Sequence, residues 1–342
     1  MSVYRATDNA EDATDPALAL DCAILRTMHQ RMALTREIDI RSWILSRQGK
    51  AHFVITGRGH EAAQVGSALA LRPGTDMVFP YYRDLGVAVA LGMTARDILL
   101  GVRARAADPS SGGRQLPMHF SHRALAIVSG SSATGTQIPH GVGAALAIRY
   151  RGEHAVAITY FGEATTSEGD FHEAMNVAAV HQLPVLFFCE NNGYGISVPQ
   201  ALQMHIERAA MRAAAYGMVG VTVDGRDPVA VYGETRRALE RALAGEGPTL
   251  IEAVCDRMTA HSSDDNETLY RTPEELTAAK ARDPLPTFER RLVALGIMTQ
   301  DEILAVRIQC QRDVDEAAAF AEQSAPPEPA DALSHVFASH HQ

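Results

Sequence analysis

Two polar side chains about thirty residues apart could together hold a hard metal ion. Glu163 closes an apolar run that ends in Gly162, and Asn192 closes a second apolar run that contains Cys189. An amphipathic helical pattern lies between the runs, so the segment has the sequence of a βαβ unit. The carboxyl ends of both strands of such a unit reach one edge of the sheet, where α/β proteins bind ligands. Mg²⁺ prefers carboxylate and amide oxygens, completed by phosphate oxygens and water. The spacing therefore predicts a metal–diphosphate site.

The surrounding residues extend this pattern. Gly162-Glu163-Ala164 is followed, in register, by Ser167-Glu168-Gly169-Asp170, the Ala178-Ala179 helix, Leu183-Pro184-Val185, Asn191-Asn192 and Tyr194-Gly195-Ile196-Ser197. The alternative interpretation is an ordinary buried βαβ unit whose strands end in polar residues by chance. A bare Gly-Glu and Asn-Asn pair would leave that alternative open, whereas the whole series favours a cofactor site.

Composition excludes several classes of partner. The 342 residues include 31 Lys and Arg against 41 Asp and Glu, a net charge of −10. We therefore expect neither nucleic acid nor an anionic membrane as the main partner. The four cysteines are widely separated and form no CxxC pair, which predicts buried thiols in a reducing compartment. Residues 1–16 are acidic and resemble neither a secretory signal nor a mitochondrial presequence. These features favour a bacterial-type cytoplasmic protein.

One uncharged segment is long enough to suggest a membrane span. Residues 124–148 contain no Asp, Glu, Lys or Arg. Gly130, Gly135 and Pro139 interrupt the segment, together with several hydroxyl side chains. We expect a polar loop that runs into a small-residue helix over 139–150, and no transmembrane segment. That helix could pack inside the protein or form a subunit contact, since small residues allow close approach.

Strand and helix patterns alternate along the chain, which predicts an α/β fold. The mostly parallel sheet should carry helices on both faces. Strands are expected at 76–80 and 249–255, a strand and turn at 217–225, a loop entering a helix at 57–71, and helices at 17–48, 85–91 and 227–243. The expected organisation is a disordered acidic N-terminus (1–16), an N-terminal helical extension (17–56), an α/β domain with the diphosphate site (57–272) and a C-terminal helical region (273–342).

With these segments placed, residues 20–335 resemble the alpha subunits of the thiamin diphosphate-dependent 2-oxo acid dehydrogenases, most of all the branched-chain type. The phrases that carry the resemblance, besides the metal segment, are GHEAAQVGSALAL, YYRDLG, GGRQLPMH, TQIPHGVGAALA, YGMVGVTVDGRD and RMTAHSSDDNETLYRT. The resemblance implies a thiamin diphosphate-binding fold, thiamin diphosphate with Mg²⁺ as cofactors, and an α₂β₂ assembly. It also implies a lipoyl acyltransferase core as partner and a 2-oxo acid as substrate.

The resemblance assigns roles to individual residues. Glu163, Asn192 and the Tyr194 carbonyl become the metal ligands. Arg83, preceded by Tyr82, should bind the diphosphate through its fixed fork; the alternative is a surface ion pair with an acid such as Asp84. His261 should lie near the diphosphate and the thiazolium carbon in a catalytic role, rather than being a solvated loop histidine.

Further contacts follow from the same resemblance. Backbone near Ser132 and Thr134 should contact the aminopyrimidine. A monovalent cation, K⁺, is implied at Ser131, Thr136 and Gln137. Ser262 and Ser263 match a loop that is phosphorylated in mitochondrial relatives, although we expect no such regulation here. The remaining cofactor-binding residues would be Gly162, Ala164, Thr165, Glu168 and Ser197.

The sequence departs from the family pattern at two places. Ala164 stands where the family usually has glycine, and alanine is tolerated there only if its φ is negative. Ala133 and Thr134 replace the usual Pro and Leu, which puts the local conformation at the pyrimidine end in doubt.

The implied reaction is the oxidative decarboxylation of a branched-chain 2-oxo acid, with reductive acylation of a lipoyl group. A pyruvate or acetoin dehydrogenase alpha subunit and a non-catalytic cofactor-binding subunit are the alternatives. A nicotinamide enzyme would need G-x-G-x-x-G after an early strand, and the sequence has none suitably placed.

Overall fold

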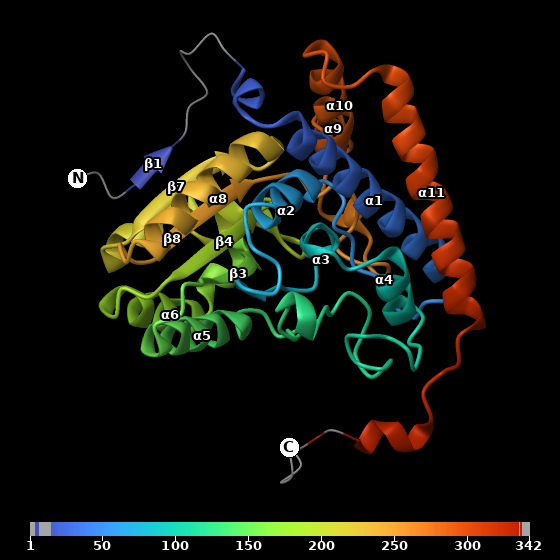
Figure 1. Ribbon diagram of the computed structural model, residues 1–342, viewed down its shortest axis with the longest axis horizontal. Helices are drawn as coiled ribbons and strands as arrows, with labels where there is room; N and C mark the ends of the chain where they lie inside the picture. Colours follow the sequence, from blue (N-terminus) through green and yellow to red (C-terminus); the bar gives the residue numbers. More distant parts are fainter. Residues whose placement is uncertain (1–3, 7–14, 335, 337–342) are drawn as a thin grey trace.

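The computed structural model describes residues 4–6, 15–334 and 336. Its central feature is a six-stranded sheet in which every neighbouring pair is parallel, as expected from the alternating pattern (Figure 1). In spatial order the strands are β1 (Tyr4–Ala6), β7 (Val219–Asp224), β8 (Thr249–Val254), β4 (Val185–Asn191), β3 (Ala157–Gly162) and β2 (Met77–Phe79). A separate two-stranded hairpin is formed by β5 (Tyr194–Gly195) and β6 (Val198–Pro199).

The helices surround the sheet and extend beyond it. They are α1 (Cys22–Arg47), α2 (Glu61–Ala68), α3 (Leu85–Leu91), α4 (Ala95–Val102), α5 (Gln137–Arg151), α6 (Gly169–Val180), α7 (Gln200–Gln203), α8 (Pro228–Leu243), α9 (Pro273–Ala281), α10 (Pro284–Ala294) and α11 (Gln300–Gln323). Short 3₁₀ helices are η1 (Pro16–Ala19), η2 (Arg123–Leu125), η3 (Glu163–Ser167), η4 (Ala209–Tyr216), η5 (Glu267–Leu269) and η6 (Pro329–Leu333).

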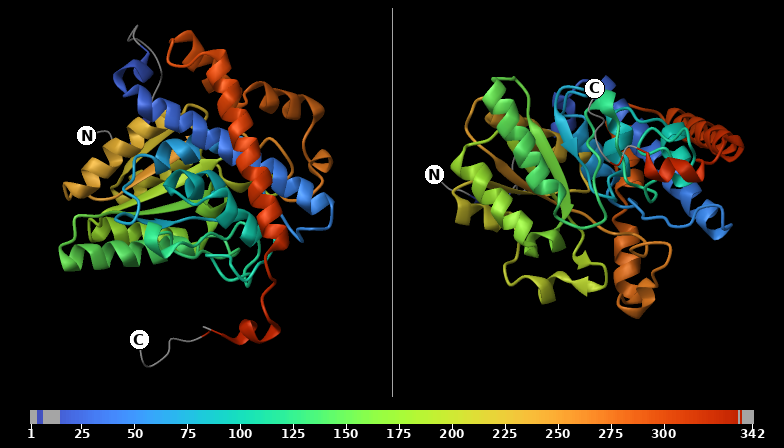
Figure 2. Two further views of the ribbon diagram at one scale, coloured as in Figure 1. Left: turned by 45° about the vertical axis from the view of Figure 1, so that its right-hand side comes forward. Right: turned by 90° about the horizontal axis from the view of Figure 1, so that it is seen from below.

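Residues on consecutive positions of β3 point to opposite faces of the sheet, and each face has its own helices. Ile158 and Tyr160 join a core with α1, α2, α3, α4, α8, α10 and α11. Ala157 and Phe161 join a second core with α5, α6 and η4. Figure 2 shows these two layers of helices from below, on either side of the strands. The prediction of a parallel sheet covered on both faces is confirmed.

Local signals explain where several helices begin. Asp227 accepts hydrogen bonds from the backbone amides of Val229 and Ala230, and Pro228 occupies the first turn of α8, as the sequence predicts. At α9, Thr272 and Glu275 form a capping box, in which each side chain accepts a bond from the other residue's backbone. Both helices therefore begin at the residues where polar side chains can satisfy free amides.

The structure differs from the sequence expectations in three places. Tyr4–Ala6 forms strand β1, paired with β7, so these residues are not disordered as predicted; residues 1–3 and 7–14 of the expected disordered segment lie outside the described residues. The helix expected over 17–48 is divided into η1 and α1, because Asp21 caps a new helix after an extended Leu20. Helix α4, which the sequence analysis did not predict, begins at a Thr94–Asp97 capping box.

The helical extensions share one core with the α/β region. Leu25 and Met32 of α1 and Val314 of α11 belong to the same buried cluster as Tyr160 of the sheet. The domain boundaries at 16, 56 and 272 stay predictions, and residues 335 and 337–342 of the C-terminal region lie outside the described part of the chain. Among the residues that the structure describes, no helix combines the length and apolarity needed to cross a membrane.

Candidate cofactor site

A cavity of about 200 Å³ opens at the carboxyl ends of β3 and β4. This is the sheet edge at which the sequence predicts a metal–diphosphate site. The residues that line the cavity come from five separate parts of the chain, and they are Tyr81, Tyr82, Arg83, Thr134, Gly162, Glu163, Ala164, Thr165, Glu168, Asn192, Tyr194, Gly195, Ile196 and His261. The structure thus brings together eleven of the thirteen predicted cofactor-binding residues, all except Ser132 and Ser197.

Glu163 and Asn192 meet at the centre of this edge. Gly162, the last residue of β3, pairs with Glu190 of β4, so Glu163 and Asn192 both leave the sheet at the same edge. The backbone amide of Asn192 donates to Glu163 Oε2 over 3.2 Å. The Glu163 carboxyl group is buried, and its second oxygen, Oε1, has no hydrogen-bond partner. Burial raises the pKa of Glu163 to about 7, despite opposing hydrogen bonds and nearby arginines.

This carboxylate fits a divalent cation. A buried carboxylate oxygen without a partner is costly, and a bound cation would satisfy it. Among the described residues no group of three or more His, Cys, Asp or Glu side chains could hold a metal. A metal ion here would therefore need the amide oxygen of Asn192, the carbonyl of Tyr194 and oxygens from a ligand. That donor set suits Mg²⁺ held together with a diphosphate.

Arg83 also lines the cavity, and it is buried rather than at the surface. Its Nη1 donates to the carbonyl of Thr56 over 2.6 Å, and its Nη2 donates to Nδ1 of His261 over 3.1 Å. The alternative ion pair with Asp84 does not describe this site, since the Asp84 carboxylate accepts the Tyr81 amide instead. A buried guanidinium beside a cavity can bind two oxygens of an anion at once.

His261 is held as a neutral imidazole. Burial and the charges of Arg83 and Arg257 lower its pKa to about 4. Because Nδ1 accepts a hydrogen bond from Arg83, the ring proton resides on Nε2. The backbone amide of His261 donates to Asp265, which fixes the loop, and the ring contacts Tyr82 edge-on. His261 can therefore donate one hydrogen bond toward a reacting group.

Comparison with known proteins matches this geometry to a family. The family model described as "Dehydrogenase E1 component" matches residues 29–330. The chain belongs to this family. The 2-oxoisovalerate dehydrogenase subunit alpha of Bacillus subtilis (strain 168) is 49% identical over 318 residues, which cover 91% of this chain and 94% of that protein. The resemblance drawn from the sequence motifs is confirmed.

Two further relatives extend the match. The mitochondrial 2-oxoisovalerate dehydrogenase subunit alpha of Homo sapiens is 35% identical over 342 residues, or 98% of this chain and 76% of that protein. The 3-methyl-2-oxobutanoate dehydrogenase subunit alpha of Mycobacterium tuberculosis (strain CDC 1551 / Oshkosh) is 41% identical over 276 residues, or 81% of this chain and 72% of that protein. Membership of the E1 family makes this chain part of an oxidoreductase and implies use of thiamin diphosphate.

Some predicted residues of the E1 chain lie away from the cavity wall. Ser132 is exposed, and its hydroxyl bonds to Nε2 of His119 over 2.7 Å. Ser197 is exposed in the β5–β6 turn. Their direct contact with cofactor stays a prediction that the cavity lining does not support.

The residues predicted to bind a monovalent cation are only partly together. The hydroxyls of Ser131 and Thr136 lie 3.1 Å apart, and both donate to the carbonyl of Ala133 over 3.2 Å. The Gln137 side chain is directed elsewhere, since its Nε2 donates to the carbonyl of Tyr160. K⁺ binding stays a prediction.

The Ala164 departure has a structural counterpart. Ala164 lies in η3 and has no positive φ, so alanine is accommodated as expected. A Cβ placed on Gly195 would stand 2.7 Å from the Cβ of Ala164, which makes glycine necessary at 195. The next residue, Ile196, has a φ of 57°, an unusual value for a β-branched side chain. Strain of this kind is often found at ligand sites, and Ile196 lines the cavity.

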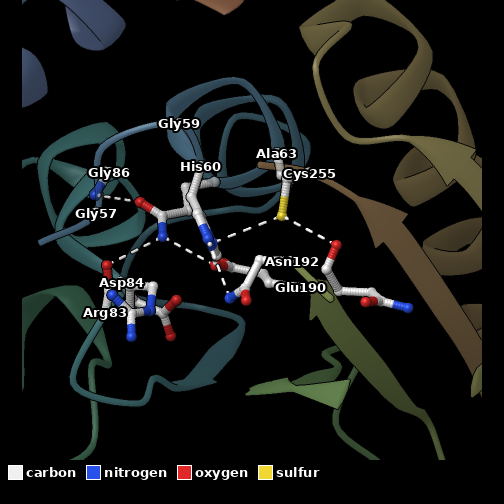
Figure 3. A network of polar contacts seen from close by, with 12 residues as sticks. Gly57, Gly59, His60, Ala63, Arg83, Asp84, Gly86, Glu190, Asn192 and Cys255 are labelled. Atoms are coloured by element: carbon white, nitrogen blue, oxygen red, sulfur yellow. Dashed lines mark hydrogen bonds and ion pairs between the residues drawn. The ribbon is translucent and has the colours of Figure 1, made fainter. Parts of the chain in front are cut away.

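A buried polar network behind the cavity escaped the sequence analysis (Figure 3). Its centre is Glu190, a charged residue that follows the apolar run of strand β4. Glu190 Oε2 accepts hydrogen bonds from His60 Nδ1 over 2.6 Å, Gln64 Nε2 over 3.0 Å and the Tyr81 hydroxyl over 3.1 Å. Burial and the charge of Glu190 raise the pKa of Asp84 well above its usual range. The sequence signal that could have indicated this network is Glu190 itself, a carboxylate within a strand that is expected to be fully buried.

Proposed function

We propose that this E1 chain is the alpha subunit of a branched-chain 2-oxo acid dehydrogenase. It would act with a beta subunit in an α₂β₂ assembly, use thiamin diphosphate and Mg²⁺, and pass the acyl unit to a lipoyl group of an acyltransferase core. The observation that carries the proposal is the buried Glu163 carboxylate, with one oxygen unpaired, beside Asn192 at the carboxyl ends of two adjacent strands.

Each wall of the cavity has a defined task in this proposal. Glu163, the Asn192 amide oxygen and the Tyr194 carbonyl would hold the metal, and Arg83 would bind diphosphate oxygens through its fork. When bound, thiamin diphosphate supplies the electron sink for decarboxylation. His261 would donate its Nε2 proton in a hydrogen bond at the substrate end. The neutral state of His261 favours this role. Because its pKa is about 4, the imidazole does not change its protonation state near neutral pH.

Several components of the proposal come from relatives. The branched-chain substrate follows from the names of the three relatives, which refer to 2-oxoisovalerate or 3-methyl-2-oxobutanoate. The beta subunit follows from their designation as alpha subunits. A cytoplasmic location and an unphosphorylated Ser262–Ser263 loop are part of the same proposal. Ser262 is buried, and the Ser263 hydroxyl oxygen accepts a hydrogen bond from the backbone amide of Val54. Neither hydroxyl is therefore freely accessible to a kinase.

Metal binding gives the direct test. Glu163→Gln preserves the shape of the side chain and removes its charge, so Mg²⁺-dependent binding of thiamin diphosphate should fall by at least about tenfold in calorimetry. Glu173→Gln is the matched control, since Glu173 is exposed on α6 and loses the same charge. Unchanged cofactor affinity in Glu163→Gln would contradict the proposed site.

Substrate choice needs a second experiment. The chain would be co-expressed with its beta subunit, and turnover would be compared for 3-methyl-2-oxobutanoate, pyruvate and acetoin. We expect the branched substrate to have the highest kcat/KM, although a methylene or two is worth only about 1–3 kcal/mol. A pyruvate rate far above the branched-chain rate would assign the chain to the pyruvate-type alternative.

A further inference from the structure

The loop that leads into α2 holds His60 in a fixed place behind the cavity. Gly59 has a φ of 95°, and a Cβ on it would stand 1.9 Å from the carbonyl oxygen of Asp256, so only glycine fits. The amide of Gly57 donates to Asp39, and the amide of Gly59 donates to Glu61. The His60 side chain is fully buried. The chain therefore delivers an imidazole to a tightly enclosed position.

The two ring nitrogens of His60 face different partners (Figure 3). Nδ1 lies 2.6 Å from Oε2 of Glu190, and Nε2 lies 3.4 Å from Nδ2 of Asn192. A carboxylate can only accept, so Nδ1 carries the proton and donates to Glu190. An amide nitrogen can only donate, so Nε2 accepts from Asn192. Glu190 thus selects the tautomer of His60 that can receive the Asn192 amide.

The same contact decides which atom of Asn192 faces the cavity. Oδ1 of Asn192 accepts the backbone amide of Tyr194 over 3.2 Å, and this bond agrees with Nδ2 being turned toward His60. If the amide were rotated by 180°, its NH₂ group would meet the Tyr194 amide and its oxygen would meet the lone pair of Nε2. Both contacts would be repulsive. Only the observed orientation keeps an oxygen available to a metal ion.

We propose that His60 is a positioning residue for the metal site, which holds the Asn192 amide with its oxygen toward the cation while Glu190 fixes the His60 tautomer. This inference rests on the proposed function, because it assumes that Asn192 binds a metal ion. Buried second partners of this kind commonly orient metal ligands, and their loss lowers metal affinity by about 10- to 100-fold.

The network also joins the metal side of the cavity to the diphosphate side. Gln64 lies one helical turn after His60, and its Nε2 donates both to Glu190 and to the carbonyl of Arg83 over 3.0 Å. Its Oε1 accepts the amide of Gly86. Since Gln64 fixes the backbone of Arg83, one set of hydrogen bonds aligns Asn192, which would bind the metal, and Arg83, which would bind the diphosphate.

Two substitutions at His60 separate its contacts. His60→Gln places an amide oxygen near the position of Nε2 and can still accept from Asn192. His60→Asn places its amide near Nδ1, so it keeps the bond to Glu190 and loses the one to Asn192. In the complex with the beta subunit, Mg²⁺ would be titrated calorimetrically at saturating thiamin diphosphate. We expect the Mg²⁺ dissociation constant to rise about tenfold or more in His60→Asn and clearly less in His60→Gln.

A second readout distinguishes positioning from general structural support. In His60→Asn, kcat at saturating Mg²⁺ should be largely retained, while the Mg²⁺ concentration for half-maximal activity rises. His29→Asn is the matched control, since His29 is also fully buried and paired with a glutamate, but lies away from the cavity. We expect His29→Asn to lower the thermal midpoint without altering the Mg²⁺ dissociation constant.

Asn192→Asp gives a background in which loss of positioning can be told apart from a general loss of stability in His60→Asn. An aspartate presents oxygens in both orientations, so the His60→Asn step should lose its effect on Mg²⁺ affinity in this background. Equal effects of His60→Asn in both backgrounds, or wild-type affinity in His60→Asn alone, would overturn the inference. Failure of the wild-type protein to bind Mg²⁺ and thiamin diphosphate would instead refute the proposed function.

Discussion

Two fully buried histidines in this chain each bond to a glutamate, and their surroundings differ. His29 of α1 contacts Glu289 of α10 over 3.0 Å, and Arg307 of α11 also binds Glu289, through Nε over 2.7 Å and Nη2 over 2.5 Å. These helices pack together beyond the sheet (Figure 1). His60 contacts Glu190, whose Oε2 also accepts hydrogen bonds from the uncharged Gln64 amide and the Tyr81 hydroxyl.

The difference indicates two uses of one side-chain pair. At Glu289 the arginine supplies the compensating charge, and hydrogen bonds from His29 and Arg307 lower the pKa of the carboxyl group although burial opposes this shift. The hydrogen bonds of that pair join three helices and do not extend to the cavity. At Glu190 the pair continues through His60 to Asn192 and so to the cavity. We therefore expect loss of the first pair to reduce stability and loss of the second to reduce cofactor binding.

The largest effect should come from Glu289→Ala. Removal of this carboxylate leaves the buried His29 without its partner and takes away the ion pair of Arg307, which should lower the free energy of unfolding by about 3 kcal/mol. Denaturant unfolding would measure the loss. Mg²⁺ affinity should stay at the wild-type value, and a parallel fall in metal binding would show that the two histidine–glutamate pairs are not separate.

Asn191→Ala should have the next largest effect on stability. Asn191 is buried, and its Nδ2 donates to Glu252 over 2.6 Å and to Gln200 over 2.8 Å. Loss of bonds to a buried carboxylate should cost about 2 kcal/mol. The neighbouring Asn192→Ala should instead reduce Mg²⁺ affinity. Thermal unfolding and calorimetry of both variants measure the contrast, which would disappear if both asparagines acted through stability.

Glu190→Gln sharpens the comparison from the cavity side. Glutamine can donate to Nδ1 of His60, so the imidazole is free to adopt the other tautomer and repel the Asn192 amide. Mg²⁺ affinity should fall about tenfold, equivalent to about 1.4 kcal/mol. The free energy of unfolding should change little, because a buried charge is removed along with its bonds. A stability loss as large as that of Glu289→Ala, at full metal affinity, would reverse our assignment.

The smallest effect concerns His261, whose side-chain partner is an arginine instead of a glutamate. Its pKa is about 4 in the folded protein and near 6.5 in an unfolded chain, so the unfolded state binds more protons between these values. The contribution of His261 to stability is therefore complete above pH 6.5 and is lost as the pH falls toward 4. Thermal midpoints of the cofactor-free protein should decline less over this range in His261→Gln than in wild type.

Sequence patterns were sufficient for the parts of the site that lie close together in the chain. Glu163 and Asn192 close two adjacent strands, and the βαβ spacing alone places them at one sheet edge. Helix α3 and the start of α8 followed from local periodicity and capping residues. Arg83 and His261 could be assigned roles only through family motifs. They are 178 residues apart, and no local sequence pattern indicates that their loops meet.

The His60 network could not be predicted in the same way. His60 and Glu190 are 130 residues apart, and a histidine between a glycine and a glutamate in a loop gives no sign of complete burial. Hydrogen-bond partners across such distances depend on how the strands and α2 are stacked. The absence of Ser132 from the cavity has a similar cause, because its hydroxyl finds His119, a partner from a different loop.

The donor set at the sheet edge has a consequence for how the protein is supplied with its cofactors. One carboxylate, one amide oxygen and one main-chain carbonyl should bind a free divalent ion with low affinity, since the remaining ligands must come from the diphosphate and water. Mg²⁺ and thiamin diphosphate should therefore load as a unit, each enhancing retention of the other. A shortage of either nutrient would empty the enzyme of both.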